Sequence, residues 1–209
     1  MIVIANPNAP TGMEIPLWQI EEILKTNPDS VVVIDEAYVD FGGTSCYKLI
    51  DTYENLLVVR TFSKSRCLAG ARLGYAFGSP ALIEDLEKLK YSTNPYNVNR
   101  LTMWLGCKTV DAEPYYQEVS RKIQSARAWA VDALKAQGFE VLPSKANFIF
   151  ARHPAISGDT LYAGLRQRGI LVRHFTKERI KDFVRITIGT QQQMEKLSDA
   201  LQEMTGGAK

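Results

Sequence analysis

A lysine, a carboxylate and a phenol each follow a short apolar run of this sequence. Lys64 follows residues 56–61, and Asp35 and Tyr38 follow residues 31–34. Short apolar runs rich in β-branched residues predict buried strands. In open α/β sheets the ligand crevice lies outside the carboxyl ends of the strands, so we expect these three side chains to face one crevice.

These residue types suit the chemistry of an aldehyde cofactor. A lysine amine forms a Schiff base with an aldehyde when part of it is neutral and nucleophilic. The pyridine nitrogen of pyridoxal phosphate needs an acidic partner, which Asp35 can supply, and Tyr38 can donate a hydrogen bond to the ring oxygen. Thr61, Ser63 and Arg72 surround the lysine in the sequence and offer hydroxyls and a guanidinium for a phosphate.

Each feature has a plainer interpretation when it is taken alone. A lysine after a strand is usually a solvated surface residue, and an Asp-Glu pair is usually a turn or a helix cap. A third polar segment, residues 6–12 (NPNAPTG), follows the expected strand at residues 2–5 and reads as a turn by itself. The three features together, in this order and at strand ends, indicate a cofactor site more specifically than any one of them.

The segments around these residues resemble fold-type I pyridoxal-phosphate aminotransferases, and the resemblance extends over essentially the whole chain. The matching segments are residues 8–12 (NAPTG), 35–38 (DEAY), 61–65 (TFSKS), 68–75 (LAGARLGY) and 185–189 (RITIG). Within that superfamily, residues 38–41 (YVDF) and 95–99 (PYNVN) are similar to the histidinol-phosphate aminotransferase group.

The resemblance implies a role for each residue near the lysine. Lys64 is the expected Schiff-base lysine and proton shuttle, Asp35 the partner of the pyridinium, and Tyr38 the donor to the ring oxygen. The expected phosphate ligands are Thr61, Ser63 and Arg72. The family's loop carries an asparagine directly before Pro-Thr-Gly, where this sequence has Ala9, so we expect Asn8, or Asn6 by a shift of the loop, to take its place.

The resemblance also implies a substrate and a reaction. Arg185, assisted by Arg173, is expected to bind the substrate's anionic end, which is a phosphate in the histidinol-phosphate group. The reaction implied is histidinol phosphate plus 2-oxoglutarate giving imidazole-acetol phosphate plus glutamate. The alternatives are a phosphothreonine decarboxylase, another amino-acid aminotransferase, and a non-catalytic binding domain of the same fold. A nucleotide-binding α/β domain is a weaker alternative, because the sequence has no phosphate-cradling glycine motif.

Strands and helices alternate along the chain, which predicts an α/β fold. The expected strands are residues 2–5, 31–34, 56–61, 73–77, 147–151, 170–173 and 183–188. The expected helices are residues 16–25, 46–53, 80–91, 98–108, 113–137, 159–168 and 191–204, with a tail at 206–209. Residues 1–112 then form part of a large domain with a mostly parallel sheet, and residues 113–209 a small α+β domain that includes the long helix.

Some helix details are expected as well. Thr190 and Gln193 resemble a capping box for the last helix. We expect Trp18, Trp104 and Trp129 to lie on the inner faces of their helices.

Bulk properties narrow the class of protein. A formal net charge of +2 over 209 residues gives no reason to expect nucleic acid or a membrane surface as a partner. Three scattered cysteines suit the reducing cytoplasm, and the two histidines lack metal-type spacing, so no metal is expected. Family members are typically homodimers, so a homodimer is expected.

The chain begins inside an expected buried strand, and the resemblance implies more than a hundred further residues upstream. Those residues would carry a loop that cradles the cofactor phosphate and an aromatic side chain that stacks on the ring. We therefore expect these 209 residues alone to bind pyridoxal phosphate weakly or not at all, and to be inactive.

Overall fold

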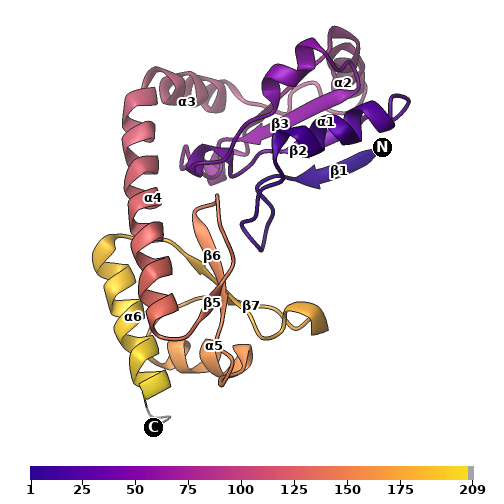
Figure 1. Ribbon diagram of the computed structural model, residues 1–209. Helices are drawn as coiled ribbons and strands as arrows, with labels where there is room; N and C mark the ends of the chain where they lie inside the picture. The colour runs from indigo at the N-terminus through magenta and orange to yellow at the C-terminus, as the bar shows by residue number, and fades with distance from the viewer. Residues whose placement is uncertain (207–209) are drawn as a thin grey trace. The chain divides into compact units, whose positions relative to one another are not determined.

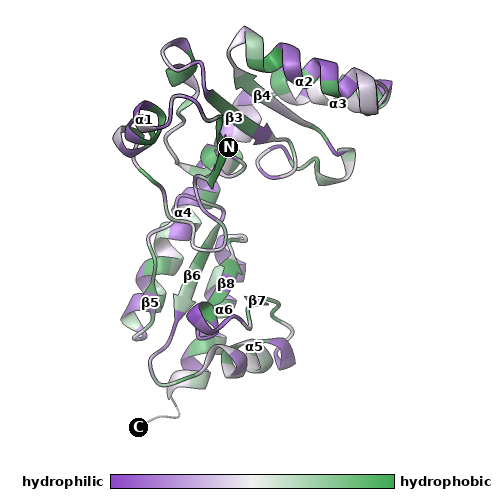
Figure 2. Ribbon diagram, turned by 90° about the vertical axis from the view of Figure 1, so that its right-hand side faces the viewer, coloured by the Kyte–Doolittle hydropathy of each residue, from purple (hydrophilic) through white to green (hydrophobic). Residues whose placement is uncertain are grey.

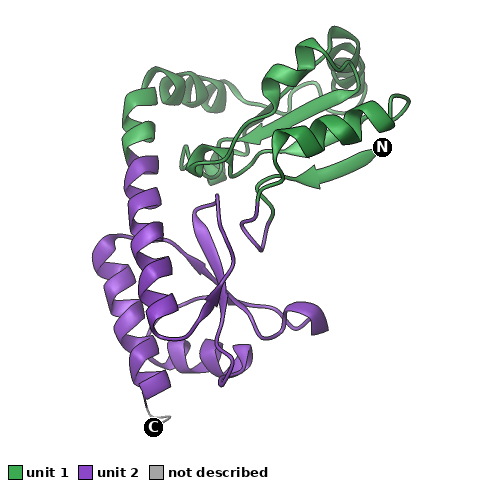
Figure 3. Cartoon of the chain, in the orientation of Figure 1, with its two compact units in different colours: residues 1–8, 14–118 green, residues 9–13, 119–209 purple. Residues whose placement is uncertain are grey.

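The computed structural model describes residues 1–206, which form two compact units (Figure 3). Unit 1 contains Met1–Asn8 and Glu14–Glu118, whereas unit 2 contains Ala9–Met13 and the chain from Val119 onward. The predicted tail falls largely outside the description: Gly206 ends the last helix, and residues 207–209 lie beyond the described part of the chain.

Unit 1 is built on a four-stranded sheet with the order β1-β2-β3-β4 (Figure 1). The strands are β1 (Ile2–Ala5), β2 (Val32–Asp35), β3 (Leu56–Thr61) and β4 (Gly74–Gly78). The first three are parallel, in agreement with the predicted crossovers. The fourth strand, β4, is antiparallel to β3, so the sheet is mostly parallel, as predicted. The segment between β3 and β4 holds only a turn and the 3-10 helix η3 (Ala69–Ala71), with no α-helix to cross the sheet.

One face of this sheet packs on helix α1 (Leu17–Thr26). Ile20 and Leu24 of α1 form a buried cluster with Val32 and Ile34 of β2 and with neighbouring side chains of β3. Because side chains alternate along a strand, Asp35 points away from this cluster. The helix predicted at residues 46–53 is a short 3-10 helix, η2 (Tyr47–Asp51).

Helices α2 (Pro80–Thr93) and α3 (Arg100–Asp111) complete unit 1, and Figure 2 shows hydrophobic as well as hydrophilic residues along both. The prediction that the tryptophans face inward is wrong, since Trp18, Trp104 and Trp129 are 65%, 57% and 36% exposed. In α1 and α3 the cause is helical periodicity. Trp18 is two residues from the buried Ile20, and Trp104 is two residues from the buried Thr102, a spacing that points to the opposite helix face.

Unit 2 contains an antiparallel sheet with the order β5-β6-β8-β7. Its strands are β5 (Glu140–Val141), β6 (Phe148–Arg152), β7 (Arg173–His174) and β8 (Val184–Thr187). The strand predicted at residues 170–173 is confirmed only at its last residue. Residues 170–172 do not pair with β8, and Leu171 among them is 80% exposed.

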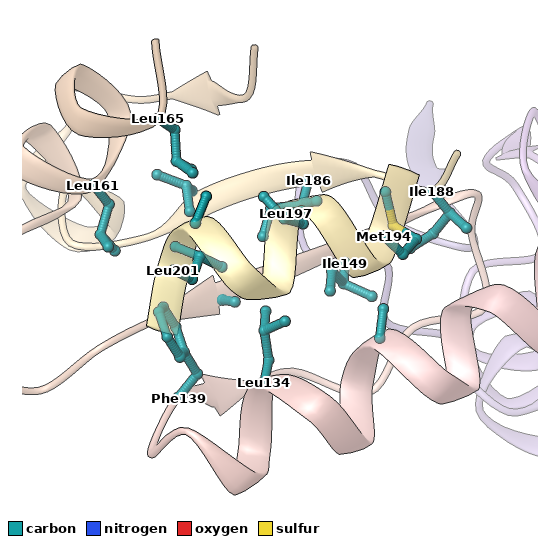
Figure 4. Close-up of a cluster of buried hydrophobic side chains, with 14 of the residues drawn as sticks. Leu134, Phe139, Ile149, Leu161, Leu165, Ile186, Ile188, Met194, Leu197 and Leu201 are labelled. Atoms are coloured by element: carbon teal, nitrogen blue, oxygen red, sulfur yellow. The ribbon is translucent and has the colours of Figure 1, made fainter. Parts of the chain in front are cut away.

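Three helices bury the core of unit 2 against one face of this sheet. They are α4 (Glu113–Ala136), α5 (Gly158–Gln167) and α6 (Gln191–Gly206). Figure 4 shows Leu134 of α4, Leu161 of α5 and Leu201 of α6 gathered around Ile149 and Ile186 of the sheet. The first residues of α4 belong to unit 1, so this helix continues from one unit into the other.

The predicted capping box of α6 is confirmed, and α4 ends one residue before its predicted end at residue 137. The Gln193 side chain accepts a hydrogen bond from the Thr190 backbone at 2.9 Å, and the Thr190 hydroxyl accepts one from the Gln193 backbone at 3.3 Å. This reciprocal pair is the capping box of α6. Gly138 follows α4 with a φ of +85°, a left-handed conformation that glycine adopts without strain.

The burial of Leu134 predicts a large effect of truncation on the stability of unit 2. We expect Leu134→Ala to lower the free energy of unfolding by about 2–5 kcal/mol, because the side chain is fully buried and its removal leaves a cavity. The same truncation at the exposed Leu171 should cost about 0.5 kcal/mol or less. Urea unfolding followed by Trp129 fluorescence, in a Trp18→Phe/Trp104→Phe background, measures unit 2 separately. Equal losses in the two variants would contradict the assignment of this core.

Candidate cofactor and substrate site

The carboxylate of Asp35 lies at the carboxyl end of β2, on the face turned away from α1. Its Oδ1 atom accepts a hydrogen bond from the Ala37 backbone at 2.9 Å, which turns the chain as it leaves the strand. The parallel register places Asp35 beside Val59 of β3. Thr61 lies two residues further along the same strand, so Asp35 and Thr61 share a face and an edge of the sheet.

Lys64 lies in a tight turn directly after β3. The Leu68 backbone donates to the Phe62 carbonyl at 2.9 Å, and the Cys67 backbone donates to the Lys64 carbonyl at 3.2 Å. Cys67 has a φ of +56°, an uncommon conformation for a residue with a side chain. The Lys64 side chain is exposed, and its Nζ atom lies 5.3 Å from the centre of the Tyr38 ring. The structure therefore brings Lys64 and Tyr38 together, three residues beyond Asp35.

Two hydroxyls lie together at the start of this turn, and Arg72 lies on the chain segment beside them. The Thr61 hydroxyl donates to the Ser63 hydroxyl at 2.9 Å and accepts from the Ser63 backbone at 3.0 Å. Thr61 also contacts the Leu73 carbonyl at 3.4 Å, which places the neighbouring Arg72 on the adjoining segment. The exposed Arg72 guanidinium donates one long hydrogen bond, of 3.3 Å, to the Ala69 carbonyl. Hydroxyls, an amide and a loosely held guanidinium are the donors that a phosphate needs, so this donor set fits the phosphate of pyridoxal phosphate.

The loop that carries Asn8 is closed at its base by Asn6. Asn6 is buried, its Oδ1 atom accepts from the Ile15 backbone at 2.7 Å, and its Nδ2 atom donates to the Ile15 carbonyl at 3.1 Å. Both ends of the Asn6 amide are thus used to hold the loop. Asn8 therefore stays the expected replacement for the asparagine that is missing at the Ala9 position.

In unit 2, Arg185 and Arg173 lie directly opposite each other on neighbouring strands. The Arg185 guanidinium lies 5.0 Å from the Phe148 ring centre, and the Arg173 guanidinium lies 5.7 Å from that of Phe175. Within residues 1–206, the buried Nε atom of Arg185 has no hydrogen-bond partner. A buried, unpaired donor next to a second cation fits an anionic ligand.

Sequence reasoning missed a buried ion pair beneath the candidate site. Glu36 is 2% exposed, and its Oε2 atom lies 2.9 Å from both Nε and Nη2 of Arg60. The same carboxylate accepts from the Ser45 hydroxyl at 2.6 Å and from the Cys46 backbone at 2.7 Å. Burial acts to lower the pKa of Arg60, but the charge of Glu36 and hydrogen bonds to Glu36 and Tyr75 raise it on balance.

The sequence did carry a signal for this pair. Glu36 directly follows Asp35, and Arg60 directly precedes Thr61. Alternation along two adjacent strands places Glu36 and Arg60 on the face opposite the two candidate site residues. A carboxylate and a guanidinium on one face of neighbouring strands are a recognisable pair once the register is known.

Comparisons with known proteins place the chain in a family. The profile described as "Aminotransferase class I and II" matches residues 1–201. The chain is 51% identical over 203 residues to histidinol-phosphate aminotransferase 1 of Pseudomonas fluorescens, covering 97% of this chain and 58% of that protein. The chain therefore belongs to the class I and II aminotransferases.

Solved structures share the fold. Histidinol-phosphate aminotransferase of Clostridium acetobutylicum superposes with a TM-score of 0.88 at 28% identity, over 98% of this chain and 64% of that one. L-threonine-O-3-phosphate decarboxylase of Porphyromonas gingivalis gives a TM-score of 0.80 at 26% identity, over 97% and 63%. The chain thus spans roughly three-fifths of the length of these relatives. None of the helices within residues 1–206 combines the length and apolarity needed to cross a bilayer.

The buried ion pair predicts an asymmetric response to charge removal. We expect Arg60→Met to destabilise unit 1 by about 3–5 kcal/mol, because it leaves the buried Glu36 carboxylate without its partner. Lys88→Met breaks an ion pair with Glu84 whose side chains are 65% and 68% exposed, and should cost about 1 kcal/mol or less. Urea unfolding followed by Trp18 and Trp104 fluorescence in a Trp129→Phe background makes the comparison. If Arg60→Met lowered the free energy of unfolding no more than Lys88→Met does, water would have to reach the Glu36 carboxylate, which contradicts its burial.

The same cluster predicts selective thiol chemistry. Burial and the charge of Glu36 raise the pKa of the Cys46 thiol far above its usual value, so this thiol stays protonated and unreactive even at mildly alkaline pH. Iodoacetamide should modify the exposed Cys67 and Cys107 of the folded chain and reach Cys46 only after denaturation. Mass spectrometry of the labelled peptides measures this order. Labelling of Cys46 at the rate of Cys67 would contradict it.

Proposed function

We propose that the whole protein is a pyridoxal-phosphate aminotransferase that converts histidinol phosphate and 2-oxoglutarate into imidazole-acetol phosphate and glutamate. The observation that carries this proposal is the position of the Lys64 amine, 5.3 Å from the Tyr38 ring centre, with Asp35 at the end of the adjacent strand. A nucleophilic amine, a phenol and a carboxylate in this arrangement are what the cofactor's aldehyde, ring oxygen and ring nitrogen require.

Each candidate site residue of unit 1 has its own role in this reaction. When bound, the cofactor supplies an electron sink for a carbanion beside the substrate nitrogen. Lys64 removes the proton from that carbon and later delivers a proton. Asp35 keeps the ring nitrogen protonated, and Tyr38 donates to the ring oxygen, to which Asn8 is a further candidate donor. The phosphate is held by Thr61, Ser63 and Arg72.

The paired arginines of unit 2 are suited to bind the anionic end of the substrate. Arg185 and Arg173 are cross-strand neighbours, and the buried Nε atom of Arg185 has no partner among the described residues. A substrate phosphate carries close to two negative charges at neutral pH and accepts several hydrogen bonds. It therefore satisfies two guanidiniums better than a single carboxylate does, which favours a phosphorylated substrate.

A phosphothreonine decarboxylase is the second candidate. It uses a phosphorylated amino acid, and a protein with that activity in its name shares the fold at 26% identity. The identity of 51% to a histidinol-phosphate aminotransferase favours the transamination. Aminotransferases for other amino acids and a non-catalytic domain of this fold are further alternatives. An adduct on Lys64 without turnover of histidinol phosphate or phosphothreonine would select the first, and the absence of an adduct the second.

The wider organisation is part of the proposal. Residues 1–112 would belong to a large cofactor-binding domain and residues 113–209 to a small domain. The whole protein would work as a homodimer in the reducing cytoplasm, an inference supported by the family resemblance and by three free cysteines.

An assay of the complete protein tests the proposal. With pyridoxal phosphate it should transfer the amino group of histidinol phosphate to 2-oxoglutarate and release no carbon dioxide from phosphothreonine. Borohydride should fix the cofactor on Lys64, as seen by peptide mass spectrometry, and Lys64→Ala should lose both this adduct and turnover. The control Lys88→Ala should keep both.

Two results would overturn the proposal or one of its parts. Release of carbon dioxide from phosphothreonine, without transamination, would select the decarboxylase, and the absence of any adduct on Lys64 would select the non-catalytic domain. We also expect the 209-residue chain alone to be inactive, and robust transamination by it would refute that part.

A further inference from the structure

A hydrogen bond joins the lysine turn to the segment that carries Asp35 and Tyr38. The hydroxyl of Ser65, the residue after Lys64, donates to Oδ2 of Asp40. Ser65 is only 7% exposed, although Lys64 before it is exposed, Arg66 after it is half-buried, and Cys67 is exposed again. The turn is therefore anchored into the protein through the residue adjacent to its lysine.

Asp40 is held firmly enough to serve as that anchor. It is the middle residue of the 3-10 helix η1 (Val39–Phe41), and its two neighbours are buried at 5% and 2% exposure. The Gly43 backbone closes this turn on the Val39 carbonyl at 2.9 Å, and the Phe41 backbone donates to the Tyr38 carbonyl at 3.2 Å. With Val39 and Phe41 fixed in the core, the backbone at Asp40 is held in place.

The lysine turn needs such an anchor. The Phe62 backbone donates to the Leu73 carbonyl and Arg66 pairs with Glu113, but the Ser65 bond is the one directly beside Lys64. Cys67 adds a left-handed residue that surrounding contacts must maintain. A lysine amine on a flexible four-carbon stem reaches many positions unless its backbone is fixed. A hydrogen bond to a carboxylate is stronger than one between neutral groups, so it suits this task.

We propose that Asp40 is a positioning residue for Lys64, acting through the Ser65 hydroxyl to hold the lysine amine beside Tyr38. This inference rests on the proposed function, in which Lys64 carries the cofactor. It assigns to Asp40 and Ser65 a role that neither the strand pattern nor the cofactor chemistry requires by itself. Both residues act on the lysine backbone and do not touch the reacting atoms.

The test measures how fast Lys64 captures pyridoxal phosphate in the complete protein. Cofactor is added, samples are quenched with borohydride at intervals, and the phosphopyridoxyl-Lys64 peptide is quantified by mass spectrometry. We expect Asp40→Ala and Ser65→Ala each to slow capture by about tenfold, the loss typical of one hydrogen bond to a charged group. The double variant should be no slower than either single variant, because both remove the same bond.

Graded variants separate positioning from general destabilisation. Ser65→Thr keeps a hydroxyl and should restore capture, and Asp40→Asn keeps an acceptor without the charge and should fall between wild type and Asp40→Ala. Asp111→Asn and Ser92→Ala make matched changes at exposed sites and should capture at the wild-type rate. Urea midpoints of the cofactor-free variants report folding independently of capture.

The outcomes distinguish this inference from the function on which it rests. Slow capture with unchanged urea midpoints and a non-additive double variant supports positioning by Asp40. Wild-type rates in Asp40→Ala and Ser65→Ala, additive losses, or losses that follow the urea midpoints would overturn it while leaving the function intact. Failure of the wild-type protein to form the Lys64 adduct would overturn both.

Discussion

The buried ion pair between Glu36 and Arg60 is the constraint on which the candidate site depends. It joins Glu36, the residue that follows β2, to the carboxyl end of β3, on the face opposite Asp35 and Thr61. A shift of either strand by one residue would bring Glu36 or Arg60 to the wrong face and leave a charge buried without its partner. Such pairs add little net stability, because desolvation offsets the attraction, but they penalise every other register. The position of Asp35, and the point at which the chain leaves β3 toward Lys64, follow from that register.

The lysine turn is fixed by a different physical means than the sheet that presents it. Apolar packing can hold strands whose side chains are buried, but the Lys64 side chain is exposed. Polar contacts therefore take over at this point: backbone hydrogen bonds close the turn, and Ser65 ties it to Asp40. The geometry of the amine depends on directional bonds, which break individually without unfolding unit 1.

Local signals in the sequence were sufficient for much of the fold and for the residues near Lys64. Strand β3 and the cap formed by Thr190 and Gln193 were predicted from apolar runs and short spacings, which one segment determines by itself. The direction of β4 and the bond from Ser65 to Asp40 depend on which segments meet in space. Periodicity alone does not contain that information.

Charge is used in opposite ways in the two units. In unit 1 the charge of the Arg60 guanidinium is balanced by Glu36, so the pair fixes the register of the two strands. In unit 2 Arg173 and Arg185 are cross-strand neighbours, an arrangement in which like charges repel. Contacts with the rings of Phe175 and Phe148 offset part of that cost without cancelling the charge. A bound anion would relieve the remaining repulsion, so part of the free energy that the sheet loses by pairing two arginines would return as affinity for the phosphate that we propose they bind.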